Sequence, residues 1–336
     1  MAWSNVPMAD GAMSADALRH CAVLGAGTMG AQIALSLALG GCPVTLWARR
    51  AESLPDAADR MRQAYRFLAA EGLAVPQRER EILGRIVYEP VLAKTVARAG
   101  FVIEAIAEVL EVKHALLTAA EALAPAEAIL ASTTSALSAT DLQTPLARPD
   151  LFCVAHYAQP AHLVALVEVV PGNQTADATT DAVIALLETT GKTPVVCPDI
   201  PGFLWARIQH AVLREFASLV GRGLATPEAC DMILKKGYAA RLPAMGSFEH
   251  ADLAGLDLMN GDAAKAVWAD LSNVTDPGET PVGALFAQGH TGMRSGRGFY
   301  DWTERDPEAF KRQRDAEIVR RVLIQAGGKV HPPHKT

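Results

Sequence analysis

Short apolar runs alternate with longer helical patterns over residues 20–198 of this 336-residue chain. Apolar runs bounded by Gly, Pro or charged residues are typical of buried strands, and apolar residues three and four positions apart are typical of helices. Strands are expected at 21–24, 44–47, 101–106, 128–131, 152–155, 165–170 and 193–196. Helices are expected at 31–39, 54–70, 111–123 and 176–190. This alternation predicts an α/β fold with a doubly wound sheet.

The pattern changes near residue 200, after the sequence Pro-Asp-Ile-Pro-Gly at 198–202. Beyond it the strand signals stop, and helical spacing interrupted by Pro and Gly covers 203–221, 227–236 and 306–325. We therefore expect a flexible tail at 1–17, an α/β domain at 18–199 and an all-helical domain at 200–336. The helix at 203–221 is apolar enough to require burial, and a homodimer interface is one place for it.

Composition and charge exclude several classes of partner. The chain is 50% hydrophobic and 20% charged with a formal net charge of -6, so it has ordinary globular composition and no basic surface for nucleic acid. Residues 23–48 carry no charge, but glycines and Pro43 divide them, so a buried strand and helix explain the stretch better than a membrane span. The N-terminus lacks the basic and apolar regions of a secretory signal.

The cysteines are odd in number and widely dispersed: Cys21, Cys42, Cys153, Cys197 and Cys230. Such a set fits neither a disulfide framework nor the paired spacing of a metal site. We expect each thiol to be a small apolar core residue rather than a nucleophile. No bound metal is expected, and the compartment is predicted to be the reducing cytoplasm.

Three glycines follow the first expected strand. The sequence Gly25, Ala26, Gly27, Thr28, Met29, Gly30 joins the strand at 21–24 to the helix at 31–39. Glycines at this spacing allow a tight turn, close backbone approach to a pyrophosphate and close helix packing, and the anion meets free amides at the helix N-terminus. Because a strand precedes the turn and a helix follows it, the segment predicts a dinucleotide cofactor.

The end of the second expected strand indicates which dinucleotide is bound. NAD-binding chains usually offer Asp or Glu to the ribose here, whereas NADP-binding chains offer Arg to the 2′-phosphate. This chain has Ala48, Arg49 and Arg50, and a guanidinium binds phosphate in a bidentate way. NADP is therefore favoured and NAD stays open. The alternative is that both arginines are solvated residues of a surface loop.

A histidine and a glutamate occupy apolar runs of the α/β domain. His156 follows the run at 151–155, and Glu168 lies inside the run at 163–170. A carboxylate in so apolar a run needs a partner, and a histidine on a neighbouring segment gains a fixed tautomer and raised basicity from it. Beside a dinucleotide site this pair predicts acid/base chemistry. His162 has no matching acidic residue, so it is interpreted as structural or as pocket lining.

Seven stretches, spread over residues 19–302, match one known pattern in order. They are VLGAGTMG, IEAIAEVLEVK, ILASTTSALS, AHYAQP, LVEVVPG, GKTPVVCPDIPGF and GRGFY. On these motifs the chain resembles the 3-hydroxyacyl-CoA dehydrogenase superfamily. The resemblance implies a Rossmann domain, a helical domain that dimerises, and a site in the cleft between them.

The resemblance also implies roles for individual residues. His156 matches the general acid/base, Glu168 its orienting partner, and Ser135 a hydroxyl near the reacting oxygen. Three further positions match residues that lie near the cofactor, namely Glu108, Lys113 and Arg294.

Three asparagines of the acyl-CoA enzymes are replaced in this chain. The Asn after the Pro-Gly-Phe motif is Ala206, the Asn of the HFFNP segment is Gln159, and the Asn two residues before the site serine is Thr133. One donor that polarises a carbonyl contributes roughly 2.7 to 4 kcal/mol, so Ala206 either weakens catalysis or makes room for another substrate. The helix that meets CoA phosphates in those enzymes is here 59–72, whose arginines are diluted by acidic residues, so CoA is not the expected substrate.

Arg241 is the expected anchor for the substrate instead. It stands in GYAARLPAMGSFE, a segment similar to the gulonate dehydrogenase, lambda-crystallin and pyridine-carboxylate dehydrogenase branch. A guanidinium in a cleft binds a carboxylate in a bidentate way. The alternative is a surface arginine at a helix end.

The sequence thus predicts a cytoplasmic, homodimeric oxidoreductase that uses NAD(P). It would move hydride between the nicotinamide and a secondary alcohol or ketone of a small carboxylated substrate of the 3-hydroxy acid type, with Gln159, Ala206 and Arg241 at the substrate. Two alternatives stay open: 3-hydroxyacyl-CoA oxidation with NAD, and a catalytically weak nucleotide-binding protein in the manner of lambda-crystallin. The direction of the reaction and the choice between carbonyl and imine are also left open.

Overall fold

The computed structural model describes residues 17–325, which form two compact units. Unit 1 contains the chain up to Ala206 together with the chain from Gln313 onward, and unit 2 is Arg207–Arg312. The flexible tail expected at 1–17 lies, apart from Ala17, outside the described residues.

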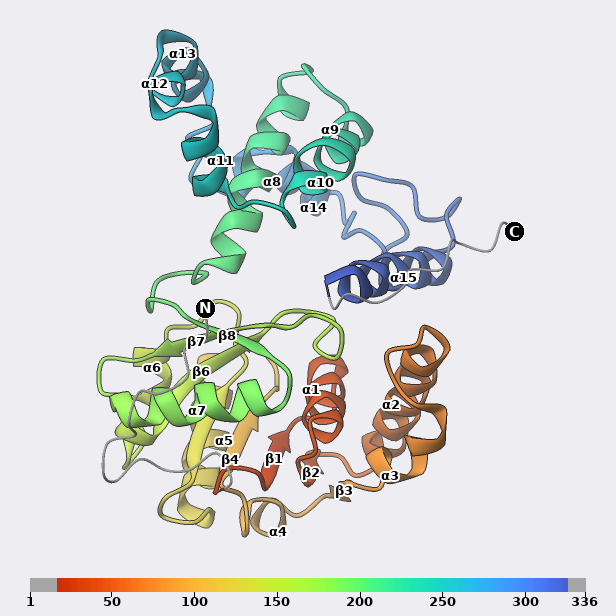
Figure 1. The fold of residues 1–336 in the computed structure, drawn as a ribbon, viewed down its shortest axis with the longest axis vertical. Coiled ribbons are helices and arrows are strands. Elements are labelled where there is room, and N and C mark those ends of the chain that lie inside the picture. The colour runs from red at the N-terminus through yellow and green to blue at the C-terminus, as the bar shows by residue number, and fades with distance from the viewer. Residues whose placement is uncertain (1–16, 326–336) are drawn as a thin grey trace. The chain divides into compact units, whose positions relative to one another are not determined.

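Unit 1 is built on an eight-stranded sheet with the order β3-β2-β1-β4-β5-β6-β7-β8 (Figure 1). The strands are β1 (Cys21–Leu24), β2 (Val44–Trp47), β3 (Ile86–Glu89), β4 (Phe101–Glu104), β5 (Ile129–Ser132), β6 (Phe152–Tyr157), β7 (Leu166–Pro171) and β8 (Thr193–Val196). Strands β1 to β6 are parallel, β7 runs antiparallel to β6, and β8 is parallel to β7. The doubly wound α/β fold expected from the sequence is confirmed.

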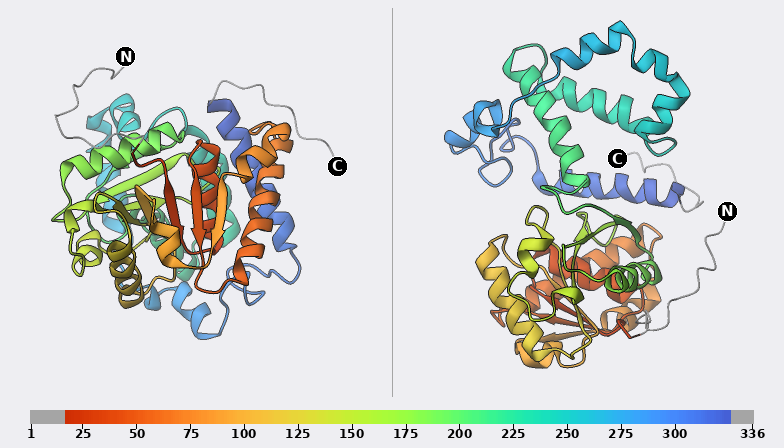
Figure 2. Two further views of the ribbon diagram at one scale, coloured as in Figure 1. Left: turned by 90° about the horizontal axis from the view of Figure 1, so that it is seen from below. Right: turned by 90° about the vertical axis from the view of Figure 1, so that its left-hand side faces the viewer.

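Helices cover both faces of this sheet (Figure 2). On one face the apolar core joins the strands to α1 (Thr28–Leu39), α2 (Ser53–Ala70), α3 (Glu79–Leu83) and α7 (Asp177–Thr189). On the other face it joins them to α4 (Leu92–Val96), α5 (Leu110–Leu123) and α6 (Ala139–Gln143). Short 3-10 turns lie at Pro76–Arg78 and Pro149–Leu151. The interior strands are apolar on both faces because both faces are covered.

Several short elements differ from the sequence-based expectation. The unexpected strand β3 lies at the sheet edge, where Val87 is 57% exposed, so it lacks the continuous apolar run of an interior strand. Helices α3, α4 and α6 have five residues each, too few for a helical period to show. Strand β4 ends at Glu104 rather than at residue 106, because the Ile106 amide donates to the Glu104 carboxylate (2.5 Å) instead of to a neighbouring strand.

The order of the strands sets where a ligand binds. Strand β1 lies between β2 and β4, and the chain builds outward to β3 on one side before it crosses to β4 on the other. In open α/β sheets the crevice outside the carboxyl ends of the strands at this switch point is the usual ligand site.

Unit 2 contains helices and no named strand over Arg207–Arg312. They are α8 (Trp205–Gly221), α9 (Pro227–Ile233), the π-helix Leu234–Tyr238, α10 (Ala239–Arg241), α11 (Ser247–Ala254), α12 (Leu256–Met259), α13 (Asp262–Asp270), the 3-10 turn Pro277–Glu279, α14 (Pro281–Ala287) and the start of α15 (Pro307–Gln325). Within residues 207–312, Ala217 and Cys230 are the only buried apolar side chains. Phe248 is 90% exposed and Trp268 is 77% exposed.

The second half of α15 belongs to unit 1. Its Val319 is fully buried in a cluster with Leu68 of α2 and Leu163. The helical domain expected at 200–336 therefore differs from the observed units at this end, because an apolar contact holds the last helix on the sheet domain. Among the described helices, none has the length and apolar character needed to cross a membrane.

Candidate active site

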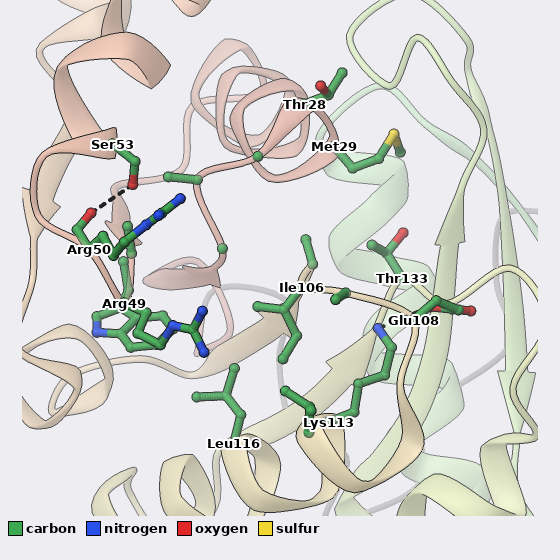
Figure 3. Close-up of a pocket in the computed structure, with 18 of the residues that line it drawn as sticks. Thr28, Met29, Arg49, Arg50, Ser53, Ile106, Glu108, Lys113, Leu116 and Thr133 are labelled. Carbon is green, nitrogen blue, oxygen red and sulfur yellow. Dashed lines mark hydrogen bonds and ion pairs between the residues drawn. The ribbon is translucent and has the colours of Figure 1, made fainter. Parts of the chain in front are cut away.

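A cavity of about 1030 Å³ lies at the carboxyl ends of β1, β2, β4 and β5, at the switch point of the sheet (Figure 3). The glycine-rich turn, the end of β2 and the loops after β4 and β5 all contribute to it. Its lining includes most residues predicted to hold a cofactor: Gly25, Ala26, Gly27, Thr28, Met29, Arg49, Arg50, Glu108 and Lys113. All of these residues belong to unit 1, so the cavity is formed within one compact unit.

The glycine-rich turn has the shape that a dinucleotide requires. A Cβ atom at Gly25 would lie 2.5 Å from the Ala105 carbonyl oxygen, and one at Gly30 would lie 1.7 Å from the Gly25 carbonyl oxygen. Gly27, by contrast, has open space around it, and no side chain caps the amides at the start of α1. Two glycines are thus needed for packing, and the third leaves free amides accessible to a pyrophosphate.

Cations gather at one end of the cavity. Arg49 and Arg50 follow β2, and Figure 3 shows both side chains on the side of the cavity opposite Glu108 and Thr133. Arg60 of α2 also lines the cavity and donates to the Ala26 carbonyl oxygen (2.6 Å). Glu108 is the only carboxylate among the lining residues, so this end carries cations without an acidic neighbour in the cavity wall.

A buried ion pair supports the other end of the cavity. The Lys113 ammonium lies 2.8 and 2.9 Å from the two carboxylate oxygens of Glu104, and both side chains are fully buried. The Ser132 hydroxyl donates to the same carboxylate (2.6 Å). Lys113 also lies 3.2 Å from Glu108 Oε2. One ammonium therefore joins a buried carboxylate to one that faces the cavity.

Glu108 connects the cavity wall to the loop that carries Ser135. Its Oε1 accepts hydrogen bonds from the Thr134 hydroxyl and from the Ser135 amide (3.1 Å). Burial favours the neutral acid, but the bond from Thr134 and the charge of Lys113 outweigh it, so the pKa of Glu108 is held below its usual value. An ionised Glu108 thus fixes the serine loop against the cofactor end of the sheet.

His156 and Glu168 are directly opposite each other on the antiparallel pair β6 and β7. Side chains of such cross-strand partners share one face of the sheet. His156 Nδ1 lies 2.7 Å from Glu168 Oε2, and His156 Nε2 lies 3.1 Å from the Ser135 hydroxyl. The structure brings together His156 and Glu168, predicted as an acid/base pair, and Ser135, which the resemblance gives as a hydroxyl near the reacting oxygen.

The second oxygen of Glu168 is held by the start of α8. Oε1 accepts hydrogen bonds from the amides of Leu204 (2.9 Å) and Trp205 (2.8 Å), and Cys197 Sγ lies 3.4 Å away. Burial opposes ionisation, but the bonds from His156 and the two amides outweigh it and lower the pKa of Glu168. An ionised Glu168 accepts from His156 Nδ1–H, which leaves Nε2 free to accept a proton.

Other predicted residues lie outside this constellation. Gly30 packs within the turn rather than lining the cavity, Gln159 is exposed in the loop between β6 and β7, and Ala206 is partly buried at the end of unit 1. Arg241 ends α10 and Arg294 follows α14, both exposed in unit 2, so their roles stay predictions.

His162 does not line the cavity. Burial lowers its pKa to about 4, and its buried Nδ1 has no hydrogen-bond partner among the described residues. These observations fit the structural interpretation of His162. All five cysteines are buried and free, and no cluster of three or more potential metal ligands occurs within residues 17–325.

Sequence reasoning missed Glu104, Phe203 and Arg60. Glu104 ends an apolar strand, so the argument applied to Glu168 would have found it, and its partner Lys113 lies nine residues further on. Phe203 is fully buried, with its ring centroid 5.8 Å from that of His156, and no pattern in the sequence signals this contact. Arg60 lies in the helix 59–72 that the resemblance connects with CoA, but its side chain reaches the glycine-rich turn.

Comparison with known proteins agrees with this geometry. The NAD-binding domain of 3-hydroxyacyl-CoA dehydrogenase matches residues 20–200, and the C-terminal domain of the same enzyme matches residues 202–302. A 5-formyl-3-hydroxy-2-methylpyridine 4-carboxylate 5-dehydrogenase from Mesorhizobium japonicum is 30% identical over 91% of this chain and 98% of its own length. A crystal structure of an enzyme of that name, described as an NAD⁺-dependent dismutase, matches with a TM-score of 0.86 at 29% identity, over 93% of this chain and all of the other.

A longer protein also matches. The fatty acid oxidation complex subunit alpha of Pseudomonas paraeruginosa is 30% identical over 92% of this chain, which spans 43% of that subunit. The two domain matches together extend over most of the described residues and cover both the cavity and the His156–Glu168 pair. This chain therefore belongs to the 3-hydroxyacyl-CoA dehydrogenase family and is a nicotinamide-dependent dehydrogenase acting on CH–OH groups.

Proposed function

We propose that this protein moves hydride between a nicotinamide and a secondary alcohol or ketone, with His156, Glu168 and Ser135 as its catalytic residues. The observation that carries the proposal is the chain of contacts from Glu168 through His156 to Ser135, 2.7 and 3.1 Å long, beside a cavity suited to a dinucleotide. A nicotinamide held in this cavity would supply the acceptor or donor of the hydride.

The protein's own residues supply the proton transfer. In oxidation, His156 Nε2 takes the hydroxyl proton of the substrate, and Ser135 holds the same oxygen by a hydrogen bond. Glu168 keeps Nδ1 protonated and stabilises the imidazolium that forms. In reduction, His156 returns the proton to the oxygen. The glycine-rich turn 25–30, Glu108 and Lys113 would hold the cofactor.

We propose that NADP(H) is preferred over NAD(H). Three guanidinium groups line the cavity, and the position after β2 that usually offers a ribose-binding carboxylate is Ala48. The name of the crystallographic relative gives NAD⁺ as the cofactor of that protein. A comparison of its residues after β2 with Ala48, Arg49 and Arg50 of this chain therefore bears on the choice of cofactor.

Replacing Arg49 with Ala should weaken NADPH binding roughly ten- to hundredfold and leave NADH binding little changed, because a charge-assisted bond contributes about 1.5 to 3 kcal/mol. Arg62 provides a matched control, since it is an exposed arginine of α2 paired with Asp59. Fluorescence titration of the variants Arg49→Ala and Arg62→Ala with both cofactors measures the effect. Tighter binding of NADH, unaffected by Arg49→Ala, would make NAD the cofactor.

We propose a small carboxylated substrate held by Arg241 rather than a CoA thioester. Two of the arginines in the helix that would meet CoA are already paired, Arg62 with Asp59 and Arg66 with Glu79. The names of the two relatives at 30% identity indicate different substrates for those proteins. One acts on a pyridine carboxylate, and the other belongs to fatty acid oxidation.

A substrate panel tests this assignment and the function together. Arg241→Leu should raise the Michaelis constant for a hydroxy acid about ten- to hundredfold and change that for its methyl ester little, because only the acid loses a charged partner. Arg222→Leu is the control, since Arg222 pairs with Asp270 in the same unit. Turnover of acetoacetyl-CoA alone, indifferent to Arg241→Leu, would favour the acyl-CoA alternative. Tight cofactor binding without turnover of any substrate would favour the lambda-crystallin-like alternative, which the loss of the amide at Ala206 suggests.

We also propose a homodimer that is formed through unit 2. The large apolar side chains that unit 2 leaves exposed, such as Phe248 and Trp268, support an interface with a second copy. The free, buried cysteines are compatible with the cytoplasm as its compartment.

A further inference from the structure

The segment between β8 and α8 folds against the His156–Glu168 pair. Asp199 anchors its first part, because the carboxylate accepts hydrogen bonds from the Ser138 hydroxyl (2.7 Å) and from the amides of Ala139 and Thr140 (both 2.9 Å) at the start of α6. Its last part supplies the two amides that bind Glu168 Oε1. We call residues 197–205 the connecting strap.

Phe203 has an unusual backbone conformation within this strap. Its φ of 46° lies in the left-handed region, next to Gly202 with φ of 75°. A bulky residue is strained in this region and persists only where its surroundings fix it. The Phe203 side chain is fully buried, and its ring lies tilted by 57° against the imidazole of His156.

We propose that Phe203 is a positioning residue for the acid/base pair. Its buried ring fixes the left-handed turn, and that turn directs the next two amides, of Leu204 and Trp205, at the Glu168 carboxylate. The same ring packs beside the imidazole, with the two ring centroids 5.8 Å apart, so one side chain bears on the positions of both His156 and Glu168. This assignment rests on the proposed function, because it gives Phe203 a task in the reaction rather than in folding alone.

Burial raises the pKa of Glu168, whereas the bond from His156 and then the amides of Trp205 and Leu204 lower it. A carboxylate that loses backbone donors binds its proton more tightly. In the folded protein the pKa of Glu168 lies below its ordinary value of 4.5, so its ionisation contributes stability above that pH, and this contribution is lost as the pH falls through the folded value. Weakening the packing that fixes the turn at Phe203 should therefore raise the pH at which Glu168 titrates.

The test compares Phe203→Leu with Phe152→Leu. Phe152 is a fully buried residue of the same apolar cluster, on β6, and its replacement removes the same atoms. Carbon-13 NMR of glutamate-labelled protein follows Glu168, which is assigned with Glu168→Gln, over the pH range in which circular dichroism shows each variant folded. Phe203→Met removes the ring in another way and serves as a second variant.

We expect the Glu168 midpoint to rise by at least about half a pH unit in both Phe203 variants and to stay unchanged in Phe152→Leu. The affinity for cofactor should be the same in all four proteins. An unchanged midpoint in the Phe203 variants, or an equal rise in Phe152→Leu, would overturn the assignment. Because the NMR titration needs no substrate, the expected shift in a protein without dehydrogenase activity would refute the proposed function and retain the coupling of Phe203 to Glu168.

Discussion

Replacing His156 with Ala is expected to lower kcat by about 10²- to 10⁴-fold, the usual contribution of a positioned acid/base group. The imidazole contacts Glu168 and Ser135 and does not line the cofactor cavity, so the affinity for NADPH should change little. Stopped-flow measurement of hydride transfer and fluorescence titration of the cofactor separate the two effects.

Replacing Glu168, the partner of His156, with Gln is a milder change and provides the comparison with His156→Ala. Glu168→Gln keeps the shape of the side chain and removes the charge that stabilises an imidazolium, so it should reduce kcat less than His156→Ala and shift the pH profile. Wild-type turnover across the pH range in either variant would show that the pair does not carry the proton.

Replacing Lys113 with Met should reduce the free energy of unfolding by about 3–5 kcal/mol, because the Glu104 carboxylate would remain buried without its counterion. Urea unfolding followed by circular dichroism measures the loss. The ammonium also contacts Glu108 at the cavity, so the variant should bind cofactor more weakly even where it is folded.

The double variant Glu104→Gln/Lys113→Met shows whether the lost charge or the changed side-chain volume accounts for the loss of stability. With both charges removed, no ion is left without a partner, and most of the stability should return. If the double variant were as unstable as Lys113→Met alone, packing rather than the unpaired carboxylate would account for the loss.

The interior of the sheet could be predicted from the sequence because its strands are buried on both faces. All four residues of β1 are buried, as are all six of β6, and both β1 and residues 152–155 of β6 are apolar runs. The edge strand β3 gives no such run, since two of its four side chains face solvent. Its place in the sheet depends on pairing with β2, which no local pattern encodes.

The candidate site likewise contains residues that the sequence pattern could predict and residues that it could not. His156 and Glu168 were predictable because a carboxylate in an apolar run requires a partner, and the register of β6 and β7 supplies one. The amides of Leu204 and Trp205 that bind Glu168 were not predictable. Every residue except proline has a backbone N–H group, so the residue type does not indicate which of them donates to a carboxylate. Arg241 and Arg294 were identified by resemblance to known proteins, and the geometry of unit 1 does not bear on them.

Because the second half of α15 packs on the sheet domain, this domain can be completed on the ribosome only after α15 has been synthesised. Leu68 and Leu163 are synthesised early, but their partner Val319 follows the whole of unit 2 in the chain. Domains generally fold in the order of synthesis. The nascent dinucleotide fold therefore keeps this apolar patch uncovered until unit 2 and α15 have been translated, and during that interval the patch is available to a chaperone.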